Sequence, residues 1–213
     1  MKKKFELGMK ALDVCKVIIE NNQIEEVTLV AYNTNFSNLR NKYCNLKDYT
    51  PDKTKTFQRT TFLNFTYESM PDINDEEVLG ISSKVKYHSS HKHIPMIDFI
   101  LVSKRYKNKL KNEIINAMDN IASFIGYTGV WILLDSGNSF HCYGDSLLNE
   151  NEWKRFVKKF SGWIEPPIYI DETLDHFVID REYMRYSLEK GYNTLRLTAN
   201  KNKPKIPEVI KIL

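Results

Sequence analysis

Cysteine is scarce in this chain of 213 residues, and long apolar runs are missing. Cys15, Cys44 and Cys142 lie far apart, and no Cys-x-x-Cys pair is present. Neither a disulfide framework nor a thiolate zinc cluster is therefore expected. No apolar run approaches the length needed to cross a bilayer, and the lysines at 2–4 lead into an amphipathic segment without the apolar stretch of a signal peptide. We therefore expect a cytoplasmic protein without a membrane partner.

Repeats, low-complexity runs and convincing linkers are also missing, and the length fits one domain, or one domain with a small subdomain. Hydrophobic residues make up 42% and charged residues 27% of the chain, which is typical of a globular protein. A formal net charge of +4 permits a polyanionic partner without requiring one. Basic residues gather at 2–4, 104–111, 154–159 and 201–205. The two middle clusters fit solvated helix faces, so the C-terminal cluster is the better candidate for binding.

The first half predicts a helix, a buried strand and a long hairpin. Apolar residues at helical spacing indicate a helix over 2–20, and residues 27–32 are typical of a buried strand. Segments 56–67 and 78–87 are rich in Thr, Val, Phe and Tyr, and turn residues at 71–75 separate them. We therefore expect these two segments to pair as strands.

The second half alternates strands with helices. Apolar strands are indicated at 94–102 and from Trp131, and a helix over 110–125 is ended by Gly126. Asn149 and Glu152 resemble a capping box for a helix closed by Gly162. A strand at 177–179, a helix at 181–190 and a last strand at 194–198 follow. This alternation indicates an α+β (mixed α/β) fold.

A hairpin over residues 135–144 carries the most informative polar residues. Ser136-Gly137-Asn138 is a strong turn signal, and alternation on the return strand sends Ser139 and His141 to one face. A hydroxyl and an imidazole held together in this way can grip an anion such as phosphate. Alternatively, the imidazole can join a metal site.

Two acidic residues interrupt apolar strands. Asp98 lies in the middle of the most apolar strand, where its carboxylate needs a metal ion, a basic side chain or backbone donors. Asp180 follows the strand at 177–179 and precedes a helix, so it can act as an N-cap, a ligand, or both.

The order of these motifs resembles the archaeo-eukaryotic primase superfamily. An acidic strand, a Ser-x-His hairpin, a hydrophobic-Asp pair and a later strand, Leu195-Arg196-Leu197, follow one another over residues 94–205. The resemblance implies one primase-like domain over 1–213, divided into an N-terminal α/β and hairpin portion (1–93) and a motif-bearing core (94–205). In that fold an N-terminal α/β unit and a C-terminal, β-rich, RRM-like unit flank a central cleft.

The resemblance also implies a chemistry and roles for residues. The implied activity is template-directed synthesis of a primer or extension product from NTP or dNTP on DNA or RNA, with Mg²⁺ or Mn²⁺. Because no helicase segment or zinc motif is recognisable, priming requires a helicase or another replication or repair protein as partner. The implied catalytic metal ligands are Asp98 and Asp180, and the implied nucleotide contacts are Ser139, His141, Arg196, Lys201 and Lys203.

The first motif departs from the family pattern. Its second acid is missing, because the residue two positions after Asp98 is Ile100 and the residue two before is Met96. Asp135 either compensates for the missing carboxylate or begins a turn. Two other functions therefore stay open: a degenerate relative that binds nucleotide or nucleic acid without polymerising, and an α/β interaction protein.

Three histidines, His88, His91 and His93, precede the Asp98 strand. They form either a transition-metal site or a solvated polar loop.

Overall fold

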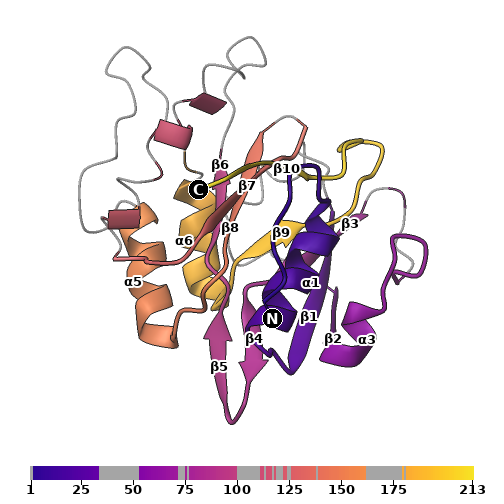
Figure 1. Ribbon diagram of the computed structural model, residues 1–213, viewed down its shortest axis with the longest axis horizontal. Coiled ribbons are helices and arrows are strands. Elements are labelled where there is room, and N and C mark those ends of the chain that lie inside the picture. Colours follow the sequence, from indigo (N-terminus) through magenta and orange to yellow (C-terminus); the bar gives the residue numbers. More distant parts are fainter. Residues whose placement is uncertain are drawn as a thin grey trace.

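Two antiparallel sheets with helices packed against them form the fold of the computed structural model (Figure 1). The structure describes residues 2–33, 53–71, 75, 77–99, 111, 112, 114–116, 118, 122, 123, 126–137, 139–161, 179 and 181–213. In this part of the chain, no helix is both long enough and apolar enough to cross a membrane. The α+β class expected from the sequence is confirmed.

The two sheets are built from different parts of the chain. The six-stranded sheet has the order β5-β4-β1-β3-β9, with β2 also paired to β1. The four-stranded sheet has the order β10-β7-β8-β6. The first sheet contains β1 (Glu26–Asn33), β2 (Lys53–Gln58), β3 (Glu77–Ser82), β4 (Lys84–Tyr87), β5 (Ser90–His93) and β9 (Thr194–Arg196). The second contains β6 (Met96–Phe99), β7 (Trp131–Asp135), β8 (Phe140–Gly144) and β10 (Glu208–Ile212).

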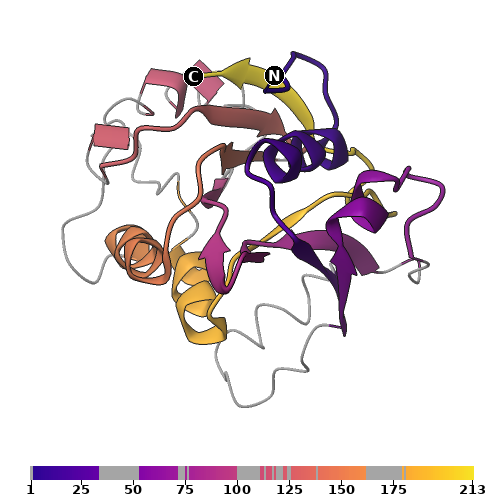
Figure 2. The same ribbon diagram turned by 60° about the horizontal axis from the view of Figure 1, so that its bottom comes forward.

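Four helices can be delimited in the described part of the chain, and they pack against the sheets. They are α1 (Ala11–Asn21), α3 (Arg59–Leu63), α5 (Glu150–Ser161) and α6 (Arg181–Lys190). Figure 2 shows α1 between the two sheets, with α5 and α6 side by side. Residues of the expected helix over 110–125 that the structure describes are also largely helical, with Ile114 and Met118 buried.

The apolar core forms two clusters, one on each side of the four-stranded sheet. In the first, α1 packs on alternate residues of β1, such as Leu29, and on inward residues of β7, such as Leu134. In the second, Phe99 and Phe140 pack with Trp153 of α5. Because neighbours along β6 and β8 face opposite clusters, Asp98 and His141 lie on the first face of the sheet, away from α5.

Strand β1 lies between β2 and β3 in the six-stranded sheet, so the expected hairpin of segments 56–67 and 78–87 is wrong. β2 pairs with one edge of β1 and β3 with the other, so segments 56–67 and 78–87 do not pair with each other. The first segment is also not a strand throughout, because the chain turns into α3 at Arg59. Phe62 of this short helix is fully buried, and that burial outweighs the β preference of its neighbours.

The N-terminal helix is shorter than its apolar spacing predicts. It begins at Ala11, not near residue 2, because Gly8 has a left-handed φ of +83° and Lys10 is extended. Gly8 N–H donates to Val209 O at 3.0 Å, and Ala11 N–H donates to Pro207 O at 2.9 Å. The segment before α1 therefore lies beside β10, a strand that the sequence did not predict.

The α5 capping box is confirmed in detail. Asn149 Oδ1 accepts the N–H groups of Asn151 and Glu152, both at 3.0 Å. In return, Glu152 Oε2 accepts the N–H of Asn149 at 2.7 Å. The first turn of α5 is therefore satisfied by side chains from the sequence pattern itself.

Candidate functional site

Asp98 and His141 face each other across neighbouring strands. Asp98 of β6 is the direct register partner of His141 of β8, and the pair shares one face of the sheet. His141 Nε2 lies 3.7 Å from Asp98 Oδ1, which is longer than a hydrogen bond. The Asp98 side chain is about a third exposed, at 32%, whereas that of His141 is nearly enclosed. The first two predicted motifs therefore meet at one place.

The environment of His141 keeps the imidazole neutral. Burial lowers the pKa of His141 well below its ordinary value, and the charges of Arg196 and Lys203 lower it further, against a smaller opposing effect of Asp135. At neutral pH the contact with Asp98 is therefore not an ion pair. Among the described residues, no group hydrogen-bonds to the buried Nδ1 of His141.

The turn before β8 holds a second unpaired polar atom. Ser136 N–H donates to Ser139 O at 3.0 Å and closes the turn, and Gly137 adopts a left-handed φ of +99°. Ser139 Oγ is buried, and no hydrogen-bond partner is found for it in the described part of the chain. A buried hydroxyl and a buried imidazole nitrogen are unfavourable without partners, and a ligand or a bound water can satisfy them.

Arg196 ties this hairpin to the C-terminal segment. One guanidinium nitrogen, Nη1, donates to the carbonyl oxygens of Thr198 and Lys205, both at 2.6 Å, and more weakly to that of Lys203 at 3.4 Å. The other, Nη2, donates to Ser136 O at 2.6 Å. Arg196 is 4% exposed. Its contacts with described residues thus include main-chain carbonyls on both sides of the site.

Two of the three lysines in the cluster at 201–205 lie at the site. Burial lowers the pKa of Lys203, with Asp98 raising and Arg196 lowering it, so these three charges are close enough to interact. Lys205 Nζ donates to Asp135 Oδ2 at 2.8 Å, although the motif pattern assigned Lys205 no role. Lys201 is exposed in the turn before Lys203.

Asp135 begins the turn that precedes β8, which is one of the two roles expected for it. Its Oδ1 accepts the Gly137 N–H at 2.8 Å while its Oδ2 accepts Lys205, so both carboxylate oxygens have partners. The turn-starting alternative is therefore confirmed.

Asp180 and Ile100 lie outside the described residues. Ile179, which precedes Asp180 in the sequence, forms an antiparallel bridge with Phe99, which follows Asp98. In the described part of the chain, no three His, Cys, Asp or Glu side chains gather closely enough to hold a metal ion. Asp98 still offers hard oxygen ligands, which suit Mg²⁺ or Mn²⁺ when phosphate oxygens and water complete the shell.

Comparison with protein families agrees with this arrangement. A family model described as AEP-like, archaeo-eukaryotic primase 1D-like, matches residues 53–208, which is well over half of the chain. The chain belongs to this primase family. No curated protein matches the primase-like chain. The matched range contains all three motifs and also takes in β2 to β5, so the family relationship extends beyond the motif-bearing residues 94–205.

One residue at the site of the primase-like chain escaped sequence reasoning. Tyr183 of α6 donates its hydroxyl hydrogen to Thr194 O at 2.8 Å and accepts the N–H of Thr194 at 2.9 Å, which joins α6 to β9. The Asp98 charge contributes to the raised pKa of Tyr183, after burial. In the sequence, Tyr183 falls at the spacing of the apolar helix residues, so the pattern indicates a packing role and nothing more.

The three histidines do not form one site. Residues 84–87 and 90–93 make a hairpin, with His88 at its turn in a left-handed conformation. His93 is fully buried and stacks on Trp153 with ring centroids 4.3 Å apart. Its Nε2 lies 3.0 Å from Glu150 Oε2 and its Nδ1 lies 3.3 Å from Ser83 Oγ. His93 therefore anchors α5 to β5.

His93 predicts a loss of stability in mild acid. Burial lowers its pKa to about 4 from 6.5, against the raising effect of Glu150, with smaller lowering effects from Lys84 and His91. Between pH 6.5 and 4 the unfolded chain binds a proton that the folded chain does not. As the pH falls through this range, the free energy of unfolding therefore drops by about 1.4 kcal/mol per pH unit, or roughly 3 kcal/mol in total.

Urea unfolding across this pH range checks the prediction. The His93→Gln variant should lose this part of the pH slope, whereas the same change at exposed His88 should keep it. His141 adds a slope of the same sign in both variants. Parallel pH profiles for wild type and His93→Gln would contradict the assignment.

Proposed function

We propose that this member of the primase family binds a nucleoside triphosphate between the Ser139–His141 hairpin and β9 and adds nucleotides to a strand opposite a DNA or RNA template. The observation that carries the proposal is that two buried atoms, Ser139 Oγ and His141 Nδ1, have no hydrogen-bond partner among the described residues. Both come from one turn and strand, beside the positive charges of Arg196 and Lys203. A triphosphate oxygen satisfies such atoms and is attracted by those charges.

Each proposed contact has a distinct physical role. The Ser139 hydroxyl and an N–H at His141 Nδ1 donate to phosphate oxygens. Lys203, whose ammonium is partly buried, adds a charge that bulk water screens little. Lys201 lies in the exposed part of the same turn and adds charge at longer range. The guanidinium of Arg196 holds the two sides of the site together and adds positive potential to it.

Asp98, with Asp180, is proposed to hold a divalent ion, Mg²⁺ or Mn²⁺. Such an ion lowers the charge on the phosphates and positions the attacking hydroxyl. The proposal further assigns the four-stranded sheet with α5 and α6 to the RRM-like unit, and the six-stranded sheet with α1 to the N-terminal unit. The nucleotide would then lie where β9 passes from one sheet toward the other.

A second candidate is a relative that binds nucleotide without polymerising. Ile100 favours it, because the first motif lacks its second acid and two closely spaced cations would share few carboxylates. Both candidates need the same nucleotide site. They differ in whether bound nucleotide reacts.

Calorimetric titration with a non-hydrolysable nucleoside triphosphate and Mg²⁺ tests the shared site. The Ser139→Ala change should weaken binding about 10- to 100-fold, because it removes a hydrogen bond to a charged group. His141→Gln should do the same, whereas His141→Asn, whose amide nitrogen falls near the position of Nδ1, should retain more affinity.

Matched controls are available on the exposed β4–β5 turn. Ser89→Ala and His88→Asn change the same residue types where both side chains are exposed, and asparagine tolerates the left-handed backbone of residue 88. Wild-type affinity in both the Ser139→Ala and His141→Gln variants would overturn the site.

A further inference from the structure

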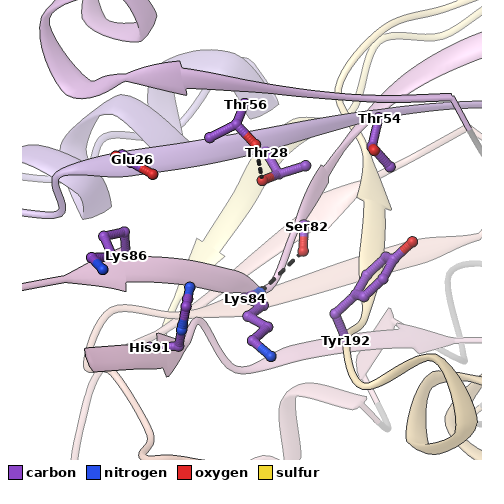
Figure 3. Close-up of a pocket in the computed structure, with 9 residues that line it drawn as sticks. All are labelled: Glu26, Thr28, Thr54, Thr56, Ser82, Lys84, Lys86, His91 and Tyr192. Atoms are coloured by element: carbon purple, nitrogen blue, oxygen red, sulfur yellow. Dashed lines mark hydrogen bonds between the residues drawn. The ribbon is translucent and has the colours of Figure 1, made fainter. Parts of the chain in front are cut away.

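A pocket with a volume of about 300 Å³ opens on the six-stranded sheet, and its lining includes neither Asp98 nor His141. Its floor is lined by hydroxyl groups, with Thr28 Oγ1 and Thr56 Oγ1 3.0 Å apart and Ser82 beside them (Figure 3). The floor therefore presents several short donors on a rigid sheet. Sequence reasoning missed it because its residues come from strands that are distant in the chain.

One side of the pocket is basic. Lys84 and Lys86 of β4 and His91 of β5 line it, and the pairing of Lys86 with His91 places these side chains on one face. In the described part of the chain, neither lysine forms an ion pair. Among the described lining residues there is one carboxylate, Glu26, which accepts a hydrogen bond from Gln58 Nε2 at 3.0 Å. The lysines outnumber that carboxylate, so the pocket favours an anion.

The other side of the pocket is aromatic. Figure 3 shows Lys86 and His91 at one end of the pocket and Tyr192 at the other. Tyr192 follows α6, and Lys190 Nζ lies 4.6 Å from its ring centroid, which brings a further positive charge to this rim. A basic wall facing an aromatic ring is suited to a ligand with a phosphate at one end and a flat base at the other.

The pocket lies on the same face of the sheet as Arg196. Arg196 is the register partner of Gly80, Gly80 of Val30, and Val30 of Thr54, which also lines the pocket. Directly paired residues share a face, so this row runs from the proposed nucleotide site to the pocket. At about 4.8 Å per strand, Thr54 lies about 14 Å from Arg196 across the sheet. An extended strand can therefore reach both places along one face.

We propose that this pocket binds one nucleotide unit of a single-stranded nucleic acid, with a backbone phosphate at Lys84 and Lys86 and a base on Tyr192. The proposal rests on the proposed function, because the strand would run along the sheet toward the nucleotide site. Stacking on an aromatic ring accepts any base, so the pocket holds the strand without reading its sequence.

Fluorescence anisotropy with a fluorescein-labelled oligo(dT) tests the pocket in the full chain. The double variant Lys84→Ala/Lys86→Ala should bind at least about tenfold more weakly, and its log–log salt slope should fall by about 0.7 for each phosphate that the lysines no longer neutralise. The control variant Lys4→Ala/Lys211→Ala removes the same charge at two exposed residues outside the pocket and should bind almost as wild type does.

Two further measurements separate this proposal from the proposed function. Ultraviolet cross-linking of the wild-type chain to the oligonucleotide, mapped by mass spectrometry, should label Tyr192 and needs no variant to fold. Triphosphate binding in the lysine variant should stay at the wild-type level, because the Ser139–His141 site is intact. Equal oligonucleotide binding by both lysine variants, or cross-links that avoid Tyr192, would overturn the pocket while leaving the nucleotide site standing. Competition by inorganic phosphate as strong as that by oligo(dT) would also overturn it, in favour of a simple anion site.

Discussion

Replacing Asp98 with asparagine should abolish template-dependent extension while the fold remains. The carboxylate is the one described acid of the proposed metal site, and asparagine keeps its shape without its charge. Since Asp98 is about a third exposed, at 32%, the amide leaves no deeply buried polar group unsatisfied. We expect the rate of extension with Mn²⁺ to fall more than about a thousandfold, equivalent to about 4 kcal/mol in the barrier.

A primer-extension gel with time points measures this loss, and Asp75→Asn at an exposed position controls for a change of charge. Full extension by Asp98→Asn would remove Asp98 from the catalytic site. If the wild-type chain binds triphosphate but makes no product, the non-polymerising candidate applies. The Ile100→Asp change, which supplies the missing acid of the first motif, should then confer extension if that absence alone prevents reaction.

The meeting of Asp98 and His141 could be anticipated from sequence because it depends on local rules. Alternation fixes which side of β8 carries Ser139 and His141, and a turn at Gly137 returns the chain beside β7. Motif order then placed the Asp98 strand in the same site. The order of the motifs did not predict that β6 lies beside β8 in the sheet, which is what pairs Asp98 directly with His141.

The errors arose where long-range pairing overrides local preference. Residues 56–67 have a strand-like composition, but β1 takes β2 and β3 on opposite edges, and burial of Phe62 favours a helical turn. The chain before α1 follows β10 through backbone hydrogen bonds, which carry no side-chain signal. The three histidines also show that closeness in sequence does not place side chains together. His88 and His91 are exposed on the β4–β5 hairpin, whereas His93, at its end, is buried and stacks on Trp153.

Replacing Arg196 with methionine should lower the free energy of unfolding by about 3–5 kcal/mol. Methionine fills a similar volume but leaves the carbonyl oxygens of Ser136, Thr198 and Lys205 without the charged donors that now satisfy them. Arg196→Lys should recover only part of the loss. Its ammonium can donate to the carbonyls on one side of the site but cannot span both sides. Urea unfolding measures both, with exposed Arg155→Met as the matched control.

The same hydrogen bonds determine how weaker nucleotide binding in Arg196 variants must be interpreted. The guanidinium joins the Ser136–Ser139 turn to the segment that carries Lys203 and Lys205, so its removal shifts other proposed ligands of the triphosphate even if Arg196 never touches it. A direct contact predicts that Arg196→Lys binds the triphosphate more weakly than its partial loss of stability explains. A positioning role predicts that affinity and stability fall together, and wild-type stability in Arg196→Met would contradict a structural role for these hydrogen bonds.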